Sequence, residues 1–272
     1  MSSNLLEPDT EELFADALAD AAGDVYLIDP SERVLRAFVA YGNRTDDDYP
    51  PVRVVADRQL LKDLFDDFLV AADTADLVAD GSLGLRELDG DVDNTLLVSE
   101  DELYAIVTAT ERVGALAADE SSFLTDAHET YAELWERSDR YNLRTPPLSR
   151  VRETMAEQMC EAVREDFDAV LASLETARGN GAGLDEVTVA LLAAANNEAL
   201  LYDISKWGED VGIASKATFS RTKTRLEDVG IVDTEKVPID VGRPRLRLKF
   251  GDEEMAAADA DELAELTMDA LA

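Results

Sequence analysis

Hydrophobic positions in the first half of the chain repeat with two different periods. Short apolar runs at 24–28 and 51–55 predict buried strands. After each run, apolar residues recur at helical spacing, which predicts one helix capped by Ser31 and another around 60–68. Further strand-like runs lie at 75–79, 83–88, 95–99, 103–108 and 112–118. The third and fourth of these runs are spaced as a hairpin.

The last element predicted in this half is a helix over 120–141, which the Thr-Pro-Pro sequence at 145–147 separates from the next helix. We predict that residues 1–144 form an α/β domain. Beyond the break, apolar residues at helical spacing predict one long helix over 149–178. Its apolar stripe consists of Val151, Met155, Met159, Val163, Phe167, Val170, Leu171 and Leu174. Such a stripe packs either against a second copy of the chain or against the first domain. We interpret 145–178 as a connecting and dimerisation helix.

Shorter helices are predicted after a glycine-rich run at 179–183, which has the composition of a linker. Asp185 is expected to cap the first of them, Asp203 the second and Ser215 the third, which Gly230 ends. The core residues expected in these helices are Val187, Leu191, Ala194, Ile204, Trp207, Val211, Phe219, Leu226 and Val229.

The segment 203–221 resembles the helix-turn-helix of winged-helix regulators. Gly208 would allow the two helices to approach closely, and Gly212 would permit a left-handed turn between them. Ile213 would fill the space between the helices. These features predict a winged helix-turn-helix domain over 184–251.

Two alternating runs, 231–237 and 245–250, predict strands that pair as a β-wing. Between them, the sequence Gly-Arg-Pro-Arg at 242–245 resembles the Gly-Arg-Pro core of minor-groove hooks. Because proline keeps the segment extended, Arg243 and Arg245 are expected to reach into a narrow groove.

Charge is distributed unevenly along the chain. It has 25 Lys and Arg against 60 Asp and Glu, a net charge of −35. Between Asp203 and Lys249, however, ten basic residues stand against eight acidic ones, which leaves this basic segment at +2 and the remainder at −37. Dispersed acidic residues with few lysines are typical of proteins from salt-in halophiles. The last segment, 252–272, is predicted to be an acidic amphipathic helix. The basic segment is the surface that could meet a polyanion.

The helix that begins after Ser215 is the candidate DNA reader. At 100° per residue, Ala217, Arg221 and Thr224 lie on the side away from the core. The flanking positions are Lys216, Thr218, Ser220 and Arg225. In a major groove, arginine can pair with guanine and threonine can meet a thymine methyl group, so double-stranded DNA is the predicted partner. Together with the two wing arginines, these residues form the candidate DNA-binding set.

The whole chain resembles a known family. The order of strand 25–28, helix, strand 52–55, helix and late hairpin resembles the phospholipase D-like sensor domain of TrmB-type sugar-responsive regulators, with the DNA reader at the C-terminus. Together with the acid-rich composition, this order is similar to the haloarchaeal TbsP family of transcriptional regulators. The resemblance implies a homodimeric regulator of metabolic genes and a small-molecule metabolite as effector. It identifies no ligand-binding positions.

Catalytic chemistry finds little support in the residues. Phospholipase D-type catalysis needs paired histidines, and the only histidine is His128, which we interpret as a surface or lightly buried helix residue. Because no nucleophile elbow, Walker loop or dinucleotide fingerprint is present, neither an enzymatic activity nor a cofactor is expected. Asp89, Asp91, Asp93 and Glu100 have the spacing of a calcium-binding EF-hand loop. Their flanks are predicted to be strands rather than helices, so no metal site is predicted.

Cys160 is the only cysteine and is expected to be a small core or interface residue, so no intrachain disulfide forms. The N-terminus lacks an export signal and no run approaches ~18 apolar residues, which predicts a cytoplasmic protein that does not span a membrane.

The alternative to DNA binding is a non-catalytic adaptor that uses its winged helix to bind proteins. The local positive charge favours DNA.

Overall fold

The computed structural model describes residues 5–7, 10–19, 21–88, 90, 92, 94–109, 112–118, 120–174, 176–178, 184–239 and 244–271. The chain divides into two compact units. Unit 1 comprises Met1–Asp66 and Asp73–Leu143, and unit 2 comprises Asp67–Ala72 and Arg144–Ala272. None of the helices in the described part of the chain combines the length and the apolar character that a membrane span requires.

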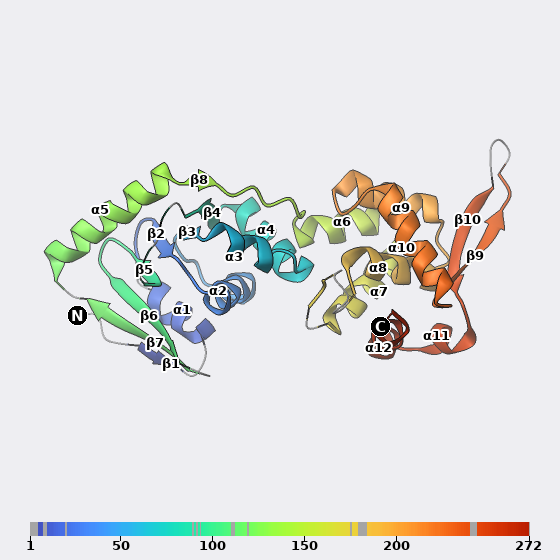
Figure 1. The fold of residues 1–272 in the computed structure, drawn as a ribbon, viewed down its shortest axis with the longest axis horizontal. Coiled ribbons are helices and arrows are strands. Elements are labelled where there is room, and N and C mark those ends of the chain that lie inside the picture. Colours follow the sequence, from blue (N-terminus) through green and yellow to red (C-terminus); the bar gives the residue numbers. More distant parts are fainter. Residues whose placement is uncertain are drawn as a thin grey trace. The chain divides into compact units, whose positions relative to one another are not determined.

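Unit 1 is built on a mixed sheet (Figure 1). Its strands lie in the order β1-β7-β6-β5-β2-β3-β4-β8. Their bounds are β1 Leu5–Glu7, β2 Val25–Ile28, β3 Val52–Ala56, β4 Leu83–Glu87, β5 Leu96–Val98, β6 Leu103–Ala109, β7 Arg112–Ala118 and β8 Asp139–Arg140. Strands β2, β3 and β4 run parallel, and the other neighbours pair antiparallel. The parallel centre explains why β2 and β3 are nearly continuous apolar runs, since parallel strands are buried on both faces.

Helices lie on both sides of this sheet. They are α1 Thr10–Leu18, α2 Glu32–Arg44, α3 Arg58–Leu64, α4 Phe68–Asp80 (whose first residues belong to unit 2) and α5 Ser121–Arg137. Figure 1 shows α5 on one side of the sheet and α1 and α2 on the other. On the α5 side, Tyr26 and Val55 of the sheet share a core with Leu124 and Leu134 of the helix. Ser31 caps α2 as predicted, by accepting a hydrogen bond from the Val34 amide at 3.4 Å.

The predicted hairpin is confirmed, because β5 pairs with β6 from Leu96↔Ala105 to Val98↔Leu103. Three other expectations are wrong. The single helix expected around 60–68 is interrupted, since α3 ends at Leu64 and α4 begins at Phe68. The run 75–79 is helical and lies within α4, where alanine and leucine favour a helix and burial on several sides hides the helical period. The helix expected over 120–141 ends at Arg137, because the next residues pair with β4 as β8.

Unit 2 contains the remaining helices and a two-stranded antiparallel ribbon. The elements are α6 Leu148–Gln158, α7 Glu161–Ala172, α8 Glu186–Asn196, α9 Leu201–Val211, α10 Lys216–Asp228, β9 Val232–Val237, β10 Arg245–Phe250, α11 Glu253–Ala257 and α12 Ala260–Leu271. The expected single helix over 149–178 is therefore wrong. Helix α6 ends before Met159, and Cys160 is extended (φ −176°, ψ 167°) and exposed rather than part of a core. This break in the helix allows the apolar residues of α6 and those of α7 to face the same core.

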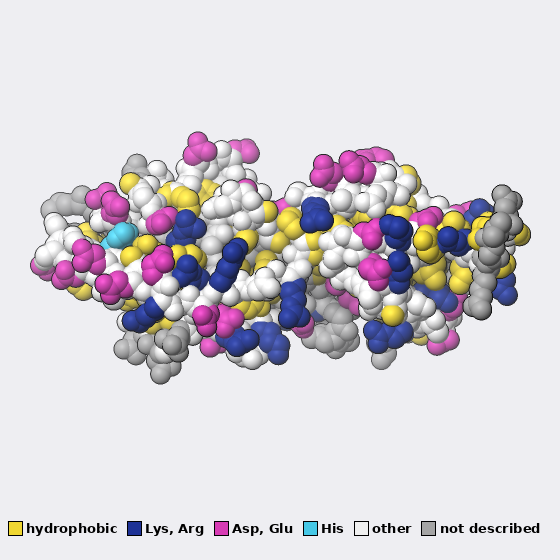
Figure 2. Space-filling view, turned by 90° about the horizontal axis from the view of Figure 1, so that it is seen from above, with side chains coloured by type: hydrophobic (Ala, Val, Ile, Leu, Met, Phe, Trp, Pro, Cys, Tyr) yellow, Lys and Arg dark blue, Asp and Glu magenta, His cyan; other side chains and the backbone are white. Residues whose placement is uncertain are grey.

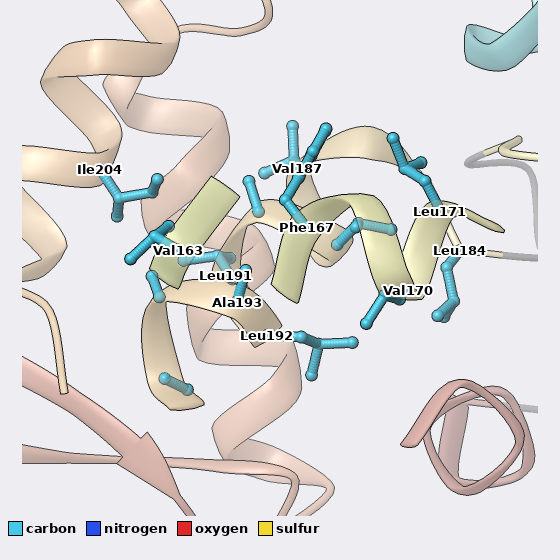
Figure 3. Packing of buried hydrophobic residues seen from close by; sticks show 14 of the residues in the cluster. Val163, Phe167, Val170, Leu171, Leu184, Val187, Leu191, Leu192, Ala193 and Ile204 are labelled. Atoms are coloured by element: carbon cyan, nitrogen blue, oxygen red, sulfur yellow. The ribbon is translucent and has the colours of Figure 1, made fainter. Parts of the chain in front are cut away.

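Helix α8 lies at the centre of that core, with residues 187–195 all buried. Figure 3 shows Val163, Phe167 and Leu171 of α7 packed beside Val187 and Leu191 of α8. Six of the eight residues of the apolar stripe are thus buried inside unit 2, and Met159 and Leu174 pack against the same core while partly buried. The stripe is used within unit 2 and does not form the expected dimer seam. The predicted linker 179–183 lies outside the described residues, and the residues on either side of it belong to unit 2.

The acidic C-terminal segment forms two helices rather than one. Asp252 caps α11 by accepting a hydrogen bond from the Met255 amide at 2.9 Å. Met255 and Leu263 are buried in the unit 2 core, and α12 packs against α7. The apolar side of this segment therefore covers part of the core, while its carboxylates remain in solvent.

Candidate nucleic-acid interface

Helices α9 and α10 form a helix-turn-helix that depends on two glycines. A Cβ atom at Gly208 would overlap with the ring of Phe219 in α10, so the close approach predicted at this position is confirmed. Gly212 ends α9 in the left-handed conformation with φ +96°, also as predicted. Asp203, however, does not cap α9, because the helix begins at Leu201. The preceding Leu200 forms a β-bridge with Arg247 of β10, which fixes an earlier start.

Helix α10 presents a polar face to solvent. Ser215 caps it, since the Thr218 amide donates to Ser215 Oγ at 3.2 Å. Phe219 and Leu226 are fully buried, but Val229, expected in the core, is 39% exposed because it follows the last residue of the helix. Of the candidate DNA-binding residues on this helix, the exposed ones are Ala217, Ser220, Arg221, Thr224 and Arg225, and the half-buried ones are Lys216 and Thr218. None is buried, in agreement with the helical wheel.

Nearby carboxylates neutralise half of the ten cations in the basic segment. The ion pairs are Lys206–Asp210, Lys216–Glu209 at 2.9 Å, Lys223–Glu227 at 2.6 Å, Arg247–Glu198 at 3.9 Å and Lys249–Asp233 at 3.7 Å. Within the part of the chain that the structure describes, four cations have no carboxylate partner: Arg221, Arg225, Lys236 and Arg245. Figure 2 shows Lys and Arg side chains, with Asp and Glu among them, over the end of unit 2 that carries α9, α10 and the ribbon. These four side chains are the described cations of the basic segment whose charge no neighbouring carboxylate offsets.

Lys216, the first residue of α10, is held by α9. Its hydrogen bond to the Glu209 carboxylate raises the pKa of Lys216 and lowers the pKa of Glu209. Because the pKa of Glu209 lies below its unfolded value, this contact stabilises the fold at pH values above that unfolded value. The contribution is lost as the pH falls through the folded pKa. At neutral pH the contact is intact and restrains the ammonium group beside the start of α10.

The structure adds Tyr202 to the site. This tyrosine of α9 is 43% exposed, and the guanidinium carbon of Arg245 lies 3.4 Å from its ring centroid. The ammonium nitrogen of Lys216 lies 6.0 Å from the same centroid. Cation–π attraction therefore brings the start of β10 and the start of α10 to one aromatic ring. Tyr202 was not predicted from the sequence, because the fold brings its two cationic partners from distant positions. The sequence signal that could have identified Tyr202 is an aromatic residue directly before the basic segment, which begins at Asp203.

The hook motif predicts that the Arg245 side chain projects freely into a groove. In the structure, Arg245 does not project freely. It is the first residue of β10 and is half-buried on the Tyr202 ring. Its Nη1 atom is buried and has no hydrogen-bond partner in the described part of the chain. The other hook residue, Arg243, lies outside the described residues. The structure thus places Arg245 against the helix-turn-helix, next to the first turn of α10.

Removing the cap of α10 is expected to destabilise that helix. Ser215→Ala should lower the free energy of unfolding of α10 by about 1 kcal/mol, because it removes the acceptor for the Thr218 amide. Ser220→Ala is the matched control, since Ser220 is exposed inside the same helix and alanine is the better helix former there. Hydrogen exchange of the α10 amides measures both changes. Equal protection in wild type and Ser215→Ala would show that the cap does not stabilise α10.

The described residues contain no group of three or more His, Cys, Asp and Glu side chains that could hold a metal ion. Asp89, Asp91 and Asp93, which have calcium-loop spacing, lie outside the described residues. The elements around them are the strands β4 and β5, not the helices that an EF-hand needs. His128 is half-buried on α5, where its ring meets the edge of Tyr26 with the centroids 5.3 Å apart.

Two solved structures resemble parts of the chain. TrmBL2, whose structure is described as that of an archaeal chromatin protein with a novel mode of DNA binding, is 17% identical, with a TM-score of 0.34 over 51% of this chain and 54% of TrmBL2. The chain therefore spans about half the length of that protein. Nuc, a phospholipase D family member from Salmonella typhimurium, is 12% identical, with a TM-score of 0.35 over 52% of this chain and 99% of Nuc. Among curated proteins, none matches the chain.

Two family models match the chain and together span nearly all of it. Residues 2–146 match the N-terminal domain of TbsP-like transcriptional regulators. Residues 147–268 match the C-terminal helix-turn-helix domain of the same regulators. The second match includes α6 and α7 as well as α9, α10 and the ribbon, so the helices before the helix-turn-helix are part of its domain. The chain belongs to the TbsP-like family of transcriptional regulators.

Proposed function

We propose that this regulator binds double-stranded DNA by placing α10 in the major groove. The observation that carries the proposal is the exposed face of α10, on which Arg221 and Arg225 have no carboxylate partner among the described residues. A free guanidinium group can pair with the O6 and N7 atoms of guanine, and the methyl group of Thr224 can meet thymine. The small side chains of Ala217 and Ser220 allow the helix backbone to approach the bases.

The start of α10 and the ribbon are proposed to hold the DNA backbone. Lys216 and Thr218 lie in the first turn of α10, where backbone amides and the helix dipole favour phosphate. Arg245 adds a cation at the same place through its contact with Tyr202. In this arrangement the ribbon is the wing of a winged helix, and Arg243 would enter the minor groove from the wing tip.

Residues 1–144 are proposed to form a sensor domain, and the regulator is proposed to act as a homodimer. The dimer proposal rests on the way helix-turn-helix proteins bind, since two copies read two half-sites about one helical turn apart. The dispersed acidity of the chain supports a halophilic origin. In concentrated salt the Debye length is only ~3 Å, so recognition would depend on close contacts rather than on net charge.

A mobility-shift experiment over a series of KCl concentrations tests this proposal. The full chain is expected to bind selected fragments of its own genome and to protect two half-sites. In each copy, four described cations have no carboxylate partner. A plot of the logarithm of the association constant against the logarithm of the salt concentration should therefore fall with a slope of roughly −4 per copy. If the folded protein shifted no fragment at any salt concentration, DNA binding would be contradicted. The protein-binding adaptor would then be the better hypothesis.

A further inference from the structure

Unit 1 contains a cavity of about 330 Å³ whose lining is positively charged. Three arginines line it, Arg53, Arg86 and Arg140, together with Trp135 and Asn142. None of the described residues that line this cavity is Asp or Glu, although acids outnumber bases by 60 to 25 in the whole chain. An acid-free lining with three cations is therefore a marked departure from the rest of the chain.

The sheet register explains how the cavity forms. Arg53 of β3 pairs with Gly84 of β4, and Arg86 lies two residues further along β4. Because side chains alternate along a strand, all three positions face the same side of the sheet, which is the side that α5 covers. A Cβ atom at Gly84 would lie 2.7 Å from Cη2 of Trp135 in α5. The glycine thus leaves room for the indole ring, which forms one wall of the cavity.

The three arginines differ in the contacts that their guanidinium groups already make within unit 1. The guanidinium carbon of Arg86 lies 4.3 Å from the centroid of the Trp135 ring. Arg86 also donates hydrogen bonds to the backbone carbonyls of Trp135 and Ser138, and so caps the C-terminal end of α5. Arg53 lies 5.7 Å from the same centroid and 3.3 Å from the Asp24 carboxylate. Arg140 is exposed on β8 and has no carboxylate partner among the described residues.

We propose that this cavity binds a small metabolite that carries an oxyanion group, either a phosphate or a carboxylate. Guanidinium groups present paired donors that match these oxyanions, and the Trp135 ring offers a flat surface for the remainder of the ligand. The volume lies at the lower end of the range for small-molecule sites, which suits a metabolite rather than a polymer. A purely structural role explains Arg86, which supports Trp135 and α5. It does not explain Arg140, which makes neither contact.

The cavity also provides a place for an effector. This step rests on the DNA-binding function proposed above: occupancy of the cavity changes the affinity of the regulator for DNA. Binding of the oxyanion itself does not depend on that function and can be measured separately.

Isothermal titration calorimetry of the full chain tests the site, with inorganic phosphate, glycerol 3-phosphate, citrate and uncharged glycerol as probes. At least one oxyanion probe is expected to bind, and glycerol is not. Comparing glycerol 3-phosphate with citrate distinguishes phosphate from carboxylate recognition. Arg140→Gln should weaken binding by about tenfold to a hundredfold, because it removes a charge-assisted contact. Arg137→Gln is the matched control, since Arg137 is exposed at the end of α5 and does not line the cavity.

The site would be overturned if no oxyanion probe bound to the folded wild-type chain, or if Arg137→Gln weakened binding as much as Arg140→Gln. Quenching of tryptophan emission by the probe, and its loss in Trp135→Phe, would place the probe at the indole wall. DNA affinity is then measured with and without the tightest probe. An unchanged DNA affinity would overturn the effector role alone. Failure to bind DNA without any probe would overturn the proposed function and leave the calorimetric result standing.

Discussion

The Gly208→Ala variant is expected to lose about 1–3 kcal/mol of stability in the helix-turn-helix, although alanine is intrinsically the better helix former. In the Phe219→Ala background, the same substitution should be neutral or should stabilise the helix by up to about 1 kcal/mol. The sign reverses because the Cβ of Ala would overlap with a ring that is fully buried between α9 and α10. Without the ring, only the helix propensity of alanine remains.

Hydrogen exchange of the α9 and α10 amides measures this cycle in the full chain, with the strand amides of unit 1 as an internal reference. Phe219→Ala alone should cost about 3–5 kcal/mol, as expected for an aromatic residue removed from a core. A Gly208→Ala effect of the same sign and size in both backgrounds would contradict the close approach of the two helices.

The Arg221→Ala variant is expected to bind DNA about 10- to 100-fold more weakly than wild type and to discriminate less among bases at one position. Arg221 is exposed on α10, and within the described residues its guanidinium makes one hydrogen bond, to Thr218 Oγ1 at 3.4 Å. The side chain is therefore free to pair with a base edge. Fluorescence anisotropy at one fixed salt concentration measures the change, and circular dichroism confirms that the variant is folded.

Lys62→Ala is the matched control for Arg221→Ala. Lys62 is exposed on α3 of unit 1, and its replacement changes the net charge by the same amount. The control should bind DNA as wild type does. If Lys62→Ala and Arg221→Ala weakened binding equally, net charge rather than contact by α10 would govern the affinity. The proposed position of α10 in the groove would then be wrong.

The helix-turn-helix was predictable because its signals are local. Gly208, Gly212 and Ser215 each carry out the role that their sequence context predicts, since a close approach, a left-handed turn and a helix cap depend on neighbouring residues. The exposed face of α10 follows in the same way from the helical period. These features required no knowledge of the rest of the fold.

Features that depend on distant contacts were not predictable. The break at Met159 and Cys160 contains neither proline nor glycine, and it arises because the apolar residues on both sides pack into one core around α8. The contact of Arg245 with Tyr202 and three of the five ion pairs also come from tertiary structure, whereas Lys206–Asp210 and Lys223–Glu227 are i,i+4 pairs within single helices. Composition showed where positive charge is concentrated, but only the fold showed which cations are free.

Genome-wide mapping of DNA occupancy in the native organism tests the central claim most directly, by comparing the tagged wild-type chain with a tagged variant that carries both Arg221→Ala and Arg225→Ala. Wild type is expected to occupy discrete sites that share a sequence motif with two half-sites, and the variant, at equal protein level, should lose them. Sites that persist unchanged in the variant, or wild-type occupancy no higher than in an untagged strain, would contradict DNA recognition by α10.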